Sequence, residues 1–227
     1  MSGKMISWKE NKVISIETRK NVFVLAQMLK RPYLKFYNLF NLDNNWENVD
    51  LNKIDTLFVN AVTNQFLKFS NISEVKNINP KTSNKDVKLW IKGFSGNRKV
   101  VVFENTEFEK EIIILGSTPG GLLVERSIYK KGKYEHPSGL FDKVVIDNIP
   151  LNKSELINNH ELMSLAVFPS MNERLFLCYK KKKNVDPFKD LRFDKKLVID
   201  DHKIFIEIIS SSDKSDQEKI LQDYFTN

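Results

Sequence analysis

Residues 13–29 read VISIETRKNVFVLAQML, and this stretch decides the fold class. Two runs rich in β-branched and aromatic residues, 13–18 and 22–29, are separated by the polar tripeptide Arg19-Lys20-Asn21. Two apolar runs divided by a short polar segment are typical of a β-hairpin. We therefore expect two antiparallel strands near the start of the chain.

Further strand-like runs follow this hairpin. Residues 33–37 read YLKFY and predict a third strand, while the apolar segment 57–69 predicts a strand or a short helix. The polar segment 77–86 contains Pro80 and is expected to be a linker or a long loop. After it, four apolar runs joined by Gly-rich segments predict successive antiparallel strands, at 89–91, 100–103, 112–115 and 122–124.

Helices are expected only late in the chain. Asn152 followed by Glu155 resembles a capping box, which predicts a helix near 153–165. Apolar residues at helical spacing predict a last helix over 215–225.

The remaining late segments, 174–179 and 203–209, have the composition of strands. Strands thus dominate, and we expect an α+β, mostly β fold. Its antiparallel sheets would form a barrel or a sandwich, with one or two helices in the C-terminal half. We expect a β-rich part over 1–95 and a second β-rich part over 96–227, either as two domains or as one.

The composition excludes several protein classes. With 227 residues, 41% hydrophobic residues and 16 Phe, the chain can bury a core, so wholesale disorder is excluded. Only 8 Gly and 1 Cys exclude collagen and a disulfide scaffold. The lone Cys178 and the lack of an apolar signal region in 1–12 predict a cytoplasmic protein. No apolar run approaches the length that spans a bilayer, so no membrane partner is expected.

The charge balance is moderately basic. There are 36 Lys and Arg against 29 Asp and Glu, a net charge of +7. Such an excess favours encounters with acidic or polyanionic partners. Most of it is Lys, and Asn is also abundant; AT-rich codons supply both, so genome composition can account for much of the excess.

No pattern in the sequence predicts catalysis, a metal or a cofactor. His136, His160 and His202 lack the spacing of metal ligands, and Asp/Glu-x-Lys tripeptides occur about as often as chance predicts. Cys178 is expected to be a buried structural residue within a strand. The segment 116–121 is Gly-rich but lacks the Lys-Ser/Thr ending of a P-loop, so a hairpin turn is expected there. We therefore do not expect an enzyme.

Two basic runs are the candidate binding residues. They are Lys130, Lys131 and Lys133, and Lys180, Lys181, Lys182 and Lys183. The simpler interpretation is two solvated turns between strands, where Lys discourages edge pairing. The alternative is a docking patch for phosphates or an acidic protein surface, and nearby Tyr129, Tyr134 and Tyr179 could then stack on nucleic acid bases.

The N-terminal part also resembles a known family. Trp8, followed by VISI at 13–16 and VFVLAQML at 22–29, is similar to the first hairpin of the immunity protein 26 family. LFVNAV at 57–62 resembles the following strand of that family. The resemblance covers residues 6–95.

The resemblance implies a function. It implies a mostly β, cytosolic bacterial protein from a polymorphic toxin system, which binds and neutralises a cognate toxin without catalysis. Because the chain is basic, the toxin surface would be acidic or neutral, or the protein would cover an exosite of the toxin. The alternative from the residues alone is a basic nucleic-acid-binding accessory protein.

Overall fold

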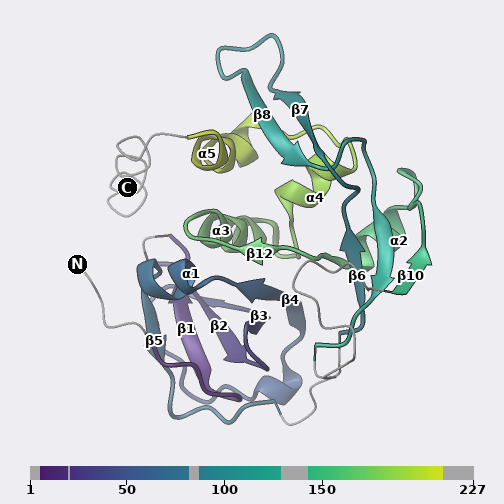
Figure 1. Ribbon diagram of the computed structural model, residues 1–227. Coiled ribbons are helices and arrows are strands. Elements are labelled where there is room, and N and C mark those ends of the chain that lie inside the picture. The colour runs from purple at the N-terminus through teal and green to yellow at the C-terminus, as the bar shows by residue number, and fades with distance from the viewer. Residues whose placement is uncertain (1–5, 20, 82–86, 129–142, 212–227) are drawn as a thin grey trace. The chain divides into compact units, whose positions relative to one another are not determined.

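A computed structural model describes residues 6–19, 21–81, 87–128 and 143–211. The chain divides into two compact units, and both are built from separate stretches of sequence. Unit 1 takes the residues before 85, residues 165–187 and those from 198 onward. Unit 2 takes residues 85–164 and 188–197. Figure 1 shows the elements of both units.

Unit 1 is built on a six-stranded sheet with the order β12-β4-β3-β2-β1-β5. Its strands are β1 (Val13–Glu17), β2 (Phe23–Met28), β3 (Tyr33–Asn41), β4 (Thr56–Val62), β5 (Ile72–Glu74) and β12 (Leu165–Ala166). All neighbours are antiparallel except β12 and β4, which run parallel. The expected hairpin is confirmed, because β1 and β2 pair from Val13 opposite Gln27 to Glu17 opposite Phe23.

The ambiguous segment 57–69 contains both a strand and a helix. After β4, helix α1 (Asn64–Phe69) begins at Thr63, whose side chain accepts a hydrogen bond from the backbone N–H of Phe66. Such an N-cap satisfies a donor that the first helical turn leaves unpaired. The 3-10 helix η1 (Leu51–Lys53) lies in the loop before β4.

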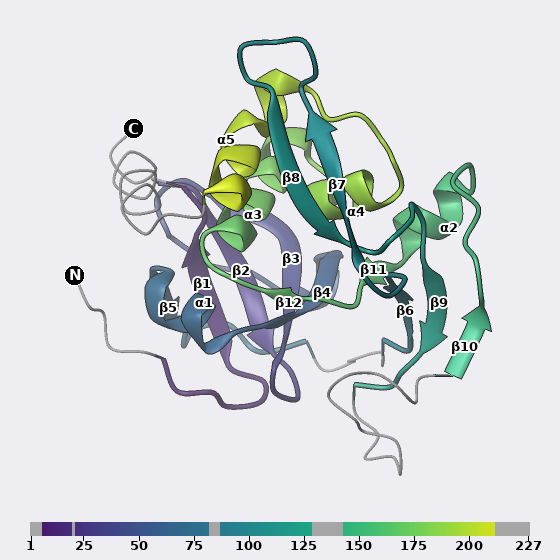
Figure 2. The same cartoon turned by 45° about the horizontal axis from the view of Figure 1, so that its top comes forward.

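Both faces of the central strands are covered, which explains why β1 and β2 are apolar almost throughout. One face packs on helix α3 (Ser170–Lys181), in a core that includes Ile14, Phe36, Phe58 and Leu175. The opposite face holds a second core of Val13, Leu25, Tyr37, Trp46, Leu51 and Ile78. Figures 1 and 2 show α3 against the sheet and helix α5 (Ile199–Ser210) on the far side of α3.

The expected strands at 174–179 and 203–209 are wrong, because these residues belong to α3 and α5. In α3, Met171, Leu175 and Cys178 lie at i, i+4 and i+7 and pack on the sheet. Since α5 covers α3 from the other side, α3 is buried on two sides and loses the one-sided pattern of a surface helix. The expected helix over 215–225 lies outside the described residues.

Unit 2 contains a four-stranded sheet and a separate hairpin. The sheet has the order β10-β9-β6-β11, with β6 (Leu89–Lys92), β9 (Leu122–Glu125), β10 (Lys143–Ile146) and β11 (Glu161–Leu162). The hairpin pairs β7 (Asn97–Val102) with β8 (Lys110–Leu115). The runs expected to be strands are therefore strands, but β6 pairs with β9 rather than with its neighbour in sequence, β7.

The segment 116–121 is not a hairpin turn, because it joins β8 to a strand of a different sheet. Gly116 and Gly120 have φ values of 103° and 102°, a conformation that glycine adopts without steric cost. The N–H groups of Gly116, Ser117 and Gly120 donate to the carbonyl oxygens of Gly96, Ser95 and Arg192. These donors are used within the fold, so the segment is a structural connection.

Two short helices complete unit 2. Helix α2 (Ser154–Asn159) begins where the capping box was expected, but its N-cap is Lys153 and no side chain caps it. It ends at Asn159 because residues 161–162 and 165–166 join sheets as β11 and β12, so the expected helix is shorter. Helix α4 (Pro187–Arg192) follows α3. Among the described helices, none has both the length and the apolar content that crossing a bilayer requires.

Candidate functional site

The basic run Lys180–Lys183 lies at the C-terminal end of α3 in unit 1, not in a turn between strands. All four lysines are exposed. Lys182 is the C-cap and has a left-handed backbone conformation, with φ 56° and ψ 25°. Positive side chains at this end of a helix are favoured by the helix dipole. The other basic run, Lys130, Lys131 and Lys133, lies outside the described residues.

Two of these lysines bind an acidic residue of α5. The Nζ atoms of Lys180 and Lys181 lie 3.6 and 2.6 Å from the carboxylate of Asp201. The hydrogen bond from Lys181 is the main cause that lowers the pKa of Asp201. The pair ties α5 to the last turn of α3.

Aromatic side chains lie next to the basic run. The ring of Tyr179 lies 5.9 Å from that of Phe176 and 5.6 Å from that of Phe40 on β3. The Nζ atom of Lys182 lies 5.4 Å from the Tyr179 ring, and the guanidinium carbon of Arg19 lies 4.0 Å from the Phe176 ring. We call this group the cation–aromatic surface, defined by Arg19, Phe40, Phe176, Tyr179 and Lys180–Lys183.

A buried ion pair fixes one end of the cation–aromatic surface. Arg19 donates two hydrogen bonds to the carboxylate of Glu173, with N···O distances of 2.9 and 2.6 Å. The Glu173 side chain is completely buried, and that of Arg19 is 24% exposed. A bidentate pair of this kind holds the guanidinium in one orientation. The adjacent Asn172 donates to the carbonyl of Glu17, which joins α3 to the end of β1.

A second buried ion pair fixes the chain after α3. Arg174 Nη1 lies 3.2 Å from Asp186 Oδ2, and both side chains are at most 5% exposed. Arg174 also donates to the carbonyl of Val185 and the side chain of Asn184, and its guanidinium covers the ring of Phe58 at 3.8 Å. The segment that follows Lys183 is thereby held against α3, which keeps the basic run in place.

The opposite face of the sheet holds a buried polar network rather than an accessible site. The Tyr37 hydroxyl donates to Gln27 Oε1, and Gln27 Nε2 donates to Asn11 Oδ1. Burial raises the pKa of Tyr37. Burial, and secondarily the nearby Lys81, lowers the pKa of Lys35 to about 8. Because the Lys35 side chain is 4% exposed, it cannot reach a ligand on the surface.

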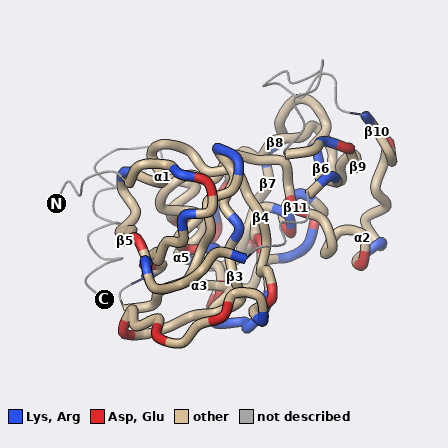
Figure 3. The backbone as a smooth tube through the Cα atoms, turned by 90° about the horizontal axis from the view of Figure 1, so that it is seen from below, with Lys and Arg blue, Asp and Glu red and all other residues tan. Residues whose placement is uncertain are grey.

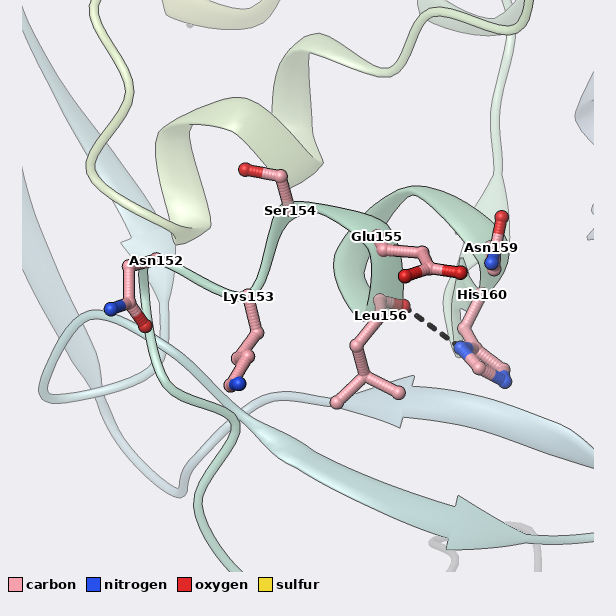
Figure 4. A pocket seen from close by; sticks show the side chains of 7 residues that line it. All are labelled: Asn152, Lys153, Ser154, Glu155, Leu156, Asn159 and His160. Carbon is pink, nitrogen blue, oxygen red and sulfur yellow. Dashed lines mark hydrogen bonds between the residues drawn. The ribbon is translucent and has the colours of Figure 1, made fainter.

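Two hollows on the surface are lined mostly by exposed side chains. One lies between residues 44–47 and 73–77 of unit 1. The other is lined by residues between 152 and 160 of unit 2 (Figure 4). There, His160 Nδ1 donates a hydrogen bond to the carbonyl oxygen of Leu156, at 2.8 Å. Ligand sites usually bury most of the ligand, and such open hollows do not.

The other sequence candidates have structural surroundings. Cys178 is fully buried as expected, although on a helix, and its sulfur accepts a hydrogen bond from the N–H of Val185. His160 lies at the end of α2 and His202 is buried on α5, whereas His136 lies outside the described residues. Within the part of the chain that the structure describes, no three His, Cys, Asp or Glu side chains gather as metal ligands would.

The cation–aromatic surface therefore combines one predicted feature with residues that the sequence analysis missed. Lys180–Lys183 and Tyr179 were candidates, but Arg19, Phe40 and Phe176 were not. The spacing of Phe176, Tyr179 and Lys182 at i, i+3 and i+6 would have shown a common ridge, had 174–179 been read as a helix. Figure 3 marks the basic and acidic residues, and both kinds occur in each unit.

The fold and this surface define an α+β, mostly β protein with two discontinuous units and a basic, aromatic patch on one of them. A family model matches residues 3–198, and the chain belongs to that family, described as "Domain of unknown function (DUF8309)". A search of curated proteins and a search of solved structures gave no match.

Proposed function

We propose that this chain is a cytosolic bacterial immunity protein that binds a cognate toxin domain and neutralises it without catalysis of its own. The resemblance of residues 6–95 to the immunity protein 26 family supports this proposal, and so does the nature of the cation–aromatic surface. The β-rich fold agrees with what that family implies.

The observation that carries the proposal is the fixed arrangement of the cation–aromatic surface. Tyr and Arg are enriched among the residues that dominate protein–protein binding. Here Arg19 is held by Glu173, and Tyr179 is packed against two other rings. Because these side chains are already ordered, binding a partner costs less conformational entropy.

A second candidate function is nucleic acid binding as an accessory protein. The exposed Lys182 and Lys183 beside Tyr179 favour it, since basic and aromatic side chains together bind single strands. Binding of this kind weakens steeply as salt increases, because contacts to phosphates release counterions. Salt dependence therefore separates the two functions.

The test begins with capture of the partner from the native organism. The tagged protein is incubated with lysate, treated with nuclease and washed at high salt, and bound proteins are identified by mass spectrometry. The captured protein is then expressed in a host cell alone and together with this chain. We expect it to stop growth when alone, and growth to be restored by co-expression.

A matched pair of variants links this result to the surface. The double variant Tyr179→Ala/Lys183→Glu should lose both capture and rescue. Lys196→Glu makes the same charge change at an exposed position of unit 2 and should retain both. Capture of only nuclease-sensitive, salt-labile material would contradict the proposal and favour nucleic acid binding.

A further inference from the structure

Resting on the proposed function, we propose that the partner segment seated on the cation–aromatic surface is acidic, and that its carboxylates bind Lys182 and Lys183 beside Tyr179. The surface thus selects a carboxylate-rich protein segment rather than a nucleic acid base.

Charge complementarity indicates that the partner segment is negatively charged. Of the cations on this surface, Arg19 is paired with Glu173, and Lys180 and Lys181 share Asp201. Among the described residues, no carboxylate forms an ion pair with Lys182 or Lys183, and both are exposed. Within the described residues, the surface therefore presents its unpaired positive charge at one point, the end of α3.

The surroundings of Tyr179 favour a carboxylate over a base. Its ring already contacts Phe40, Phe176 and the ammonium of Lys182. Base stacking needs an open ring face, and three groups already contact this half-buried ring. In the described part of the chain the Tyr179 hydroxyl has no hydrogen-bond partner, so it can donate to a carboxylate that also binds the lysines.

The left-handed backbone conformation of Lys182 supports a binding role for its side chain. A left-handed residue at a helix end is usually glycine, because a Cβ atom is disfavoured there. At Lys182 this conformation accompanies an ammonium held 5.4 Å from the Tyr179 ring. Lys182→Gly consequently separates the two roles, since glycine suits the backbone but removes the charge.

The test uses a short fluorescein-labelled poly-glutamate peptide as the probe, with fluorescence anisotropy as the readout. Lys182→Gly and Lys183→Ala should each weaken binding about two- to fivefold, the range for exposed ion pairs. Lys182→Gly should leave the melting temperature unchanged or higher. Tyr179→Phe keeps the ring packing and should also weaken binding, because it removes only the hydroxyl. Lys196→Ala, an exposed lysine of unit 2, should bind like the parent.

Two results of the binding assay would overturn the inference. One is an equal loss of binding in Lys196→Ala, which would mean attraction to overall charge only. The other is tighter binding of labelled poly-dT than of poly-glutamate, weakened by the same variants, which would mean a nucleic acid site. Growth rescue tests the proposed function separately: rescue that survives in Lys182→Gly/Lys183→Ala would reject the acidic contact while keeping the immunity function.

Discussion

Removing Arg19 should destabilise unit 1 by leaving a negative charge buried without its partner. In Arg19→Met, the completely buried Glu173 carboxylate loses two hydrogen bonds of 2.9 and 2.6 Å. Breaking one side of a buried pair costs about 3–5 kcal/mol. The methionine retains apolar contact with Phe176, so most of the loss should come from the charge.

Urea denaturation followed by circular dichroism measures this loss. With a slope of about 2 kcal/mol per molar urea, the midpoint should fall by about 2 M. Arg31→Met is the matched control, because exposed Arg31 hydrogen-bonds exposed Asn64 on the surface. It should change stability by less than about 0.5 kcal/mol.

A double-mutant cycle separates the charge from the packing. Arg19→Met/Glu173→Leu removes both charges and should recover most of the stability, because apolar replacements of buried ion pairs are often neutral. A loss of less than about 1 kcal/mol in Arg19→Met, or simple additivity of the two single substitutions, would contradict a coupled buried ion pair between Arg19 and Glu173.

Three further outcomes follow from other parts of the structure. Because burial lowers the pKa of Lys35 from its usual 10.5 to about 8 in the fold, the unfolded chain binds more protons between these two pH values, so stability should rise with pH there. Lys35→Met should abolish this rise in urea titrations at pH 7.5 and 9.5. Gly121→Ala should cost about 1–3 kcal/mol, since a Cβ atom would lie 2.7 Å from the Lys92 carbonyl oxygen, and thermal melting checks it. Cys178 should react with a thiol reagent only on unfolding, as absorbance would show.

Local patterns predicted the strands of this protein better than their pairing. The hairpin of β1 and β2 was readable because a short polar segment separates two β-rich runs. The pairing of β6 with β9 was not readable, because β7 and β8 intervene and form their own sheet. Strands that are consecutive in sequence usually pair with each other. Here the Gly-rich segments 93–96 and 116–121 connect strands of different sheets instead.

The helices were harder to predict than the strands. α5 contains the run KIFIEII at 203–209, which is rich in β-branched residues. From sequence alone, such a run predicts a strand. α3 is covered by the sheet and by α5, so both of its sides carry apolar residues. Long-range packing thus overrode local propensity in both segments.

Only part of the candidate site could be predicted from the sequence, because α3 was not recognised as a helix. The lysines of 180–183 were visible as a run of charge, but their meaning depended on the element that carries them. Once α3 is a helix, Tyr179 and Phe176 share a ridge, and Arg19 reaches it from the end of β1 across a wide gap in sequence. No spacing rule connects Arg19 to Glu173.

The central strands of unit 1 are synthesised well before the helix that covers them. β4 ends at Val62 and α3 begins at Ser170, so at ribosomal speeds the covering helix emerges roughly 5–20 s after the four central strands β1–β4. During that interval, the sheet face that carries Ile14, Phe36 and Phe58 lacks α3, and only the short helix α1 contributes to the same core, through Phe66 and Leu67. The nascent chain is therefore a natural client for chaperones, and shortened chains that end before Ser170 should aggregate.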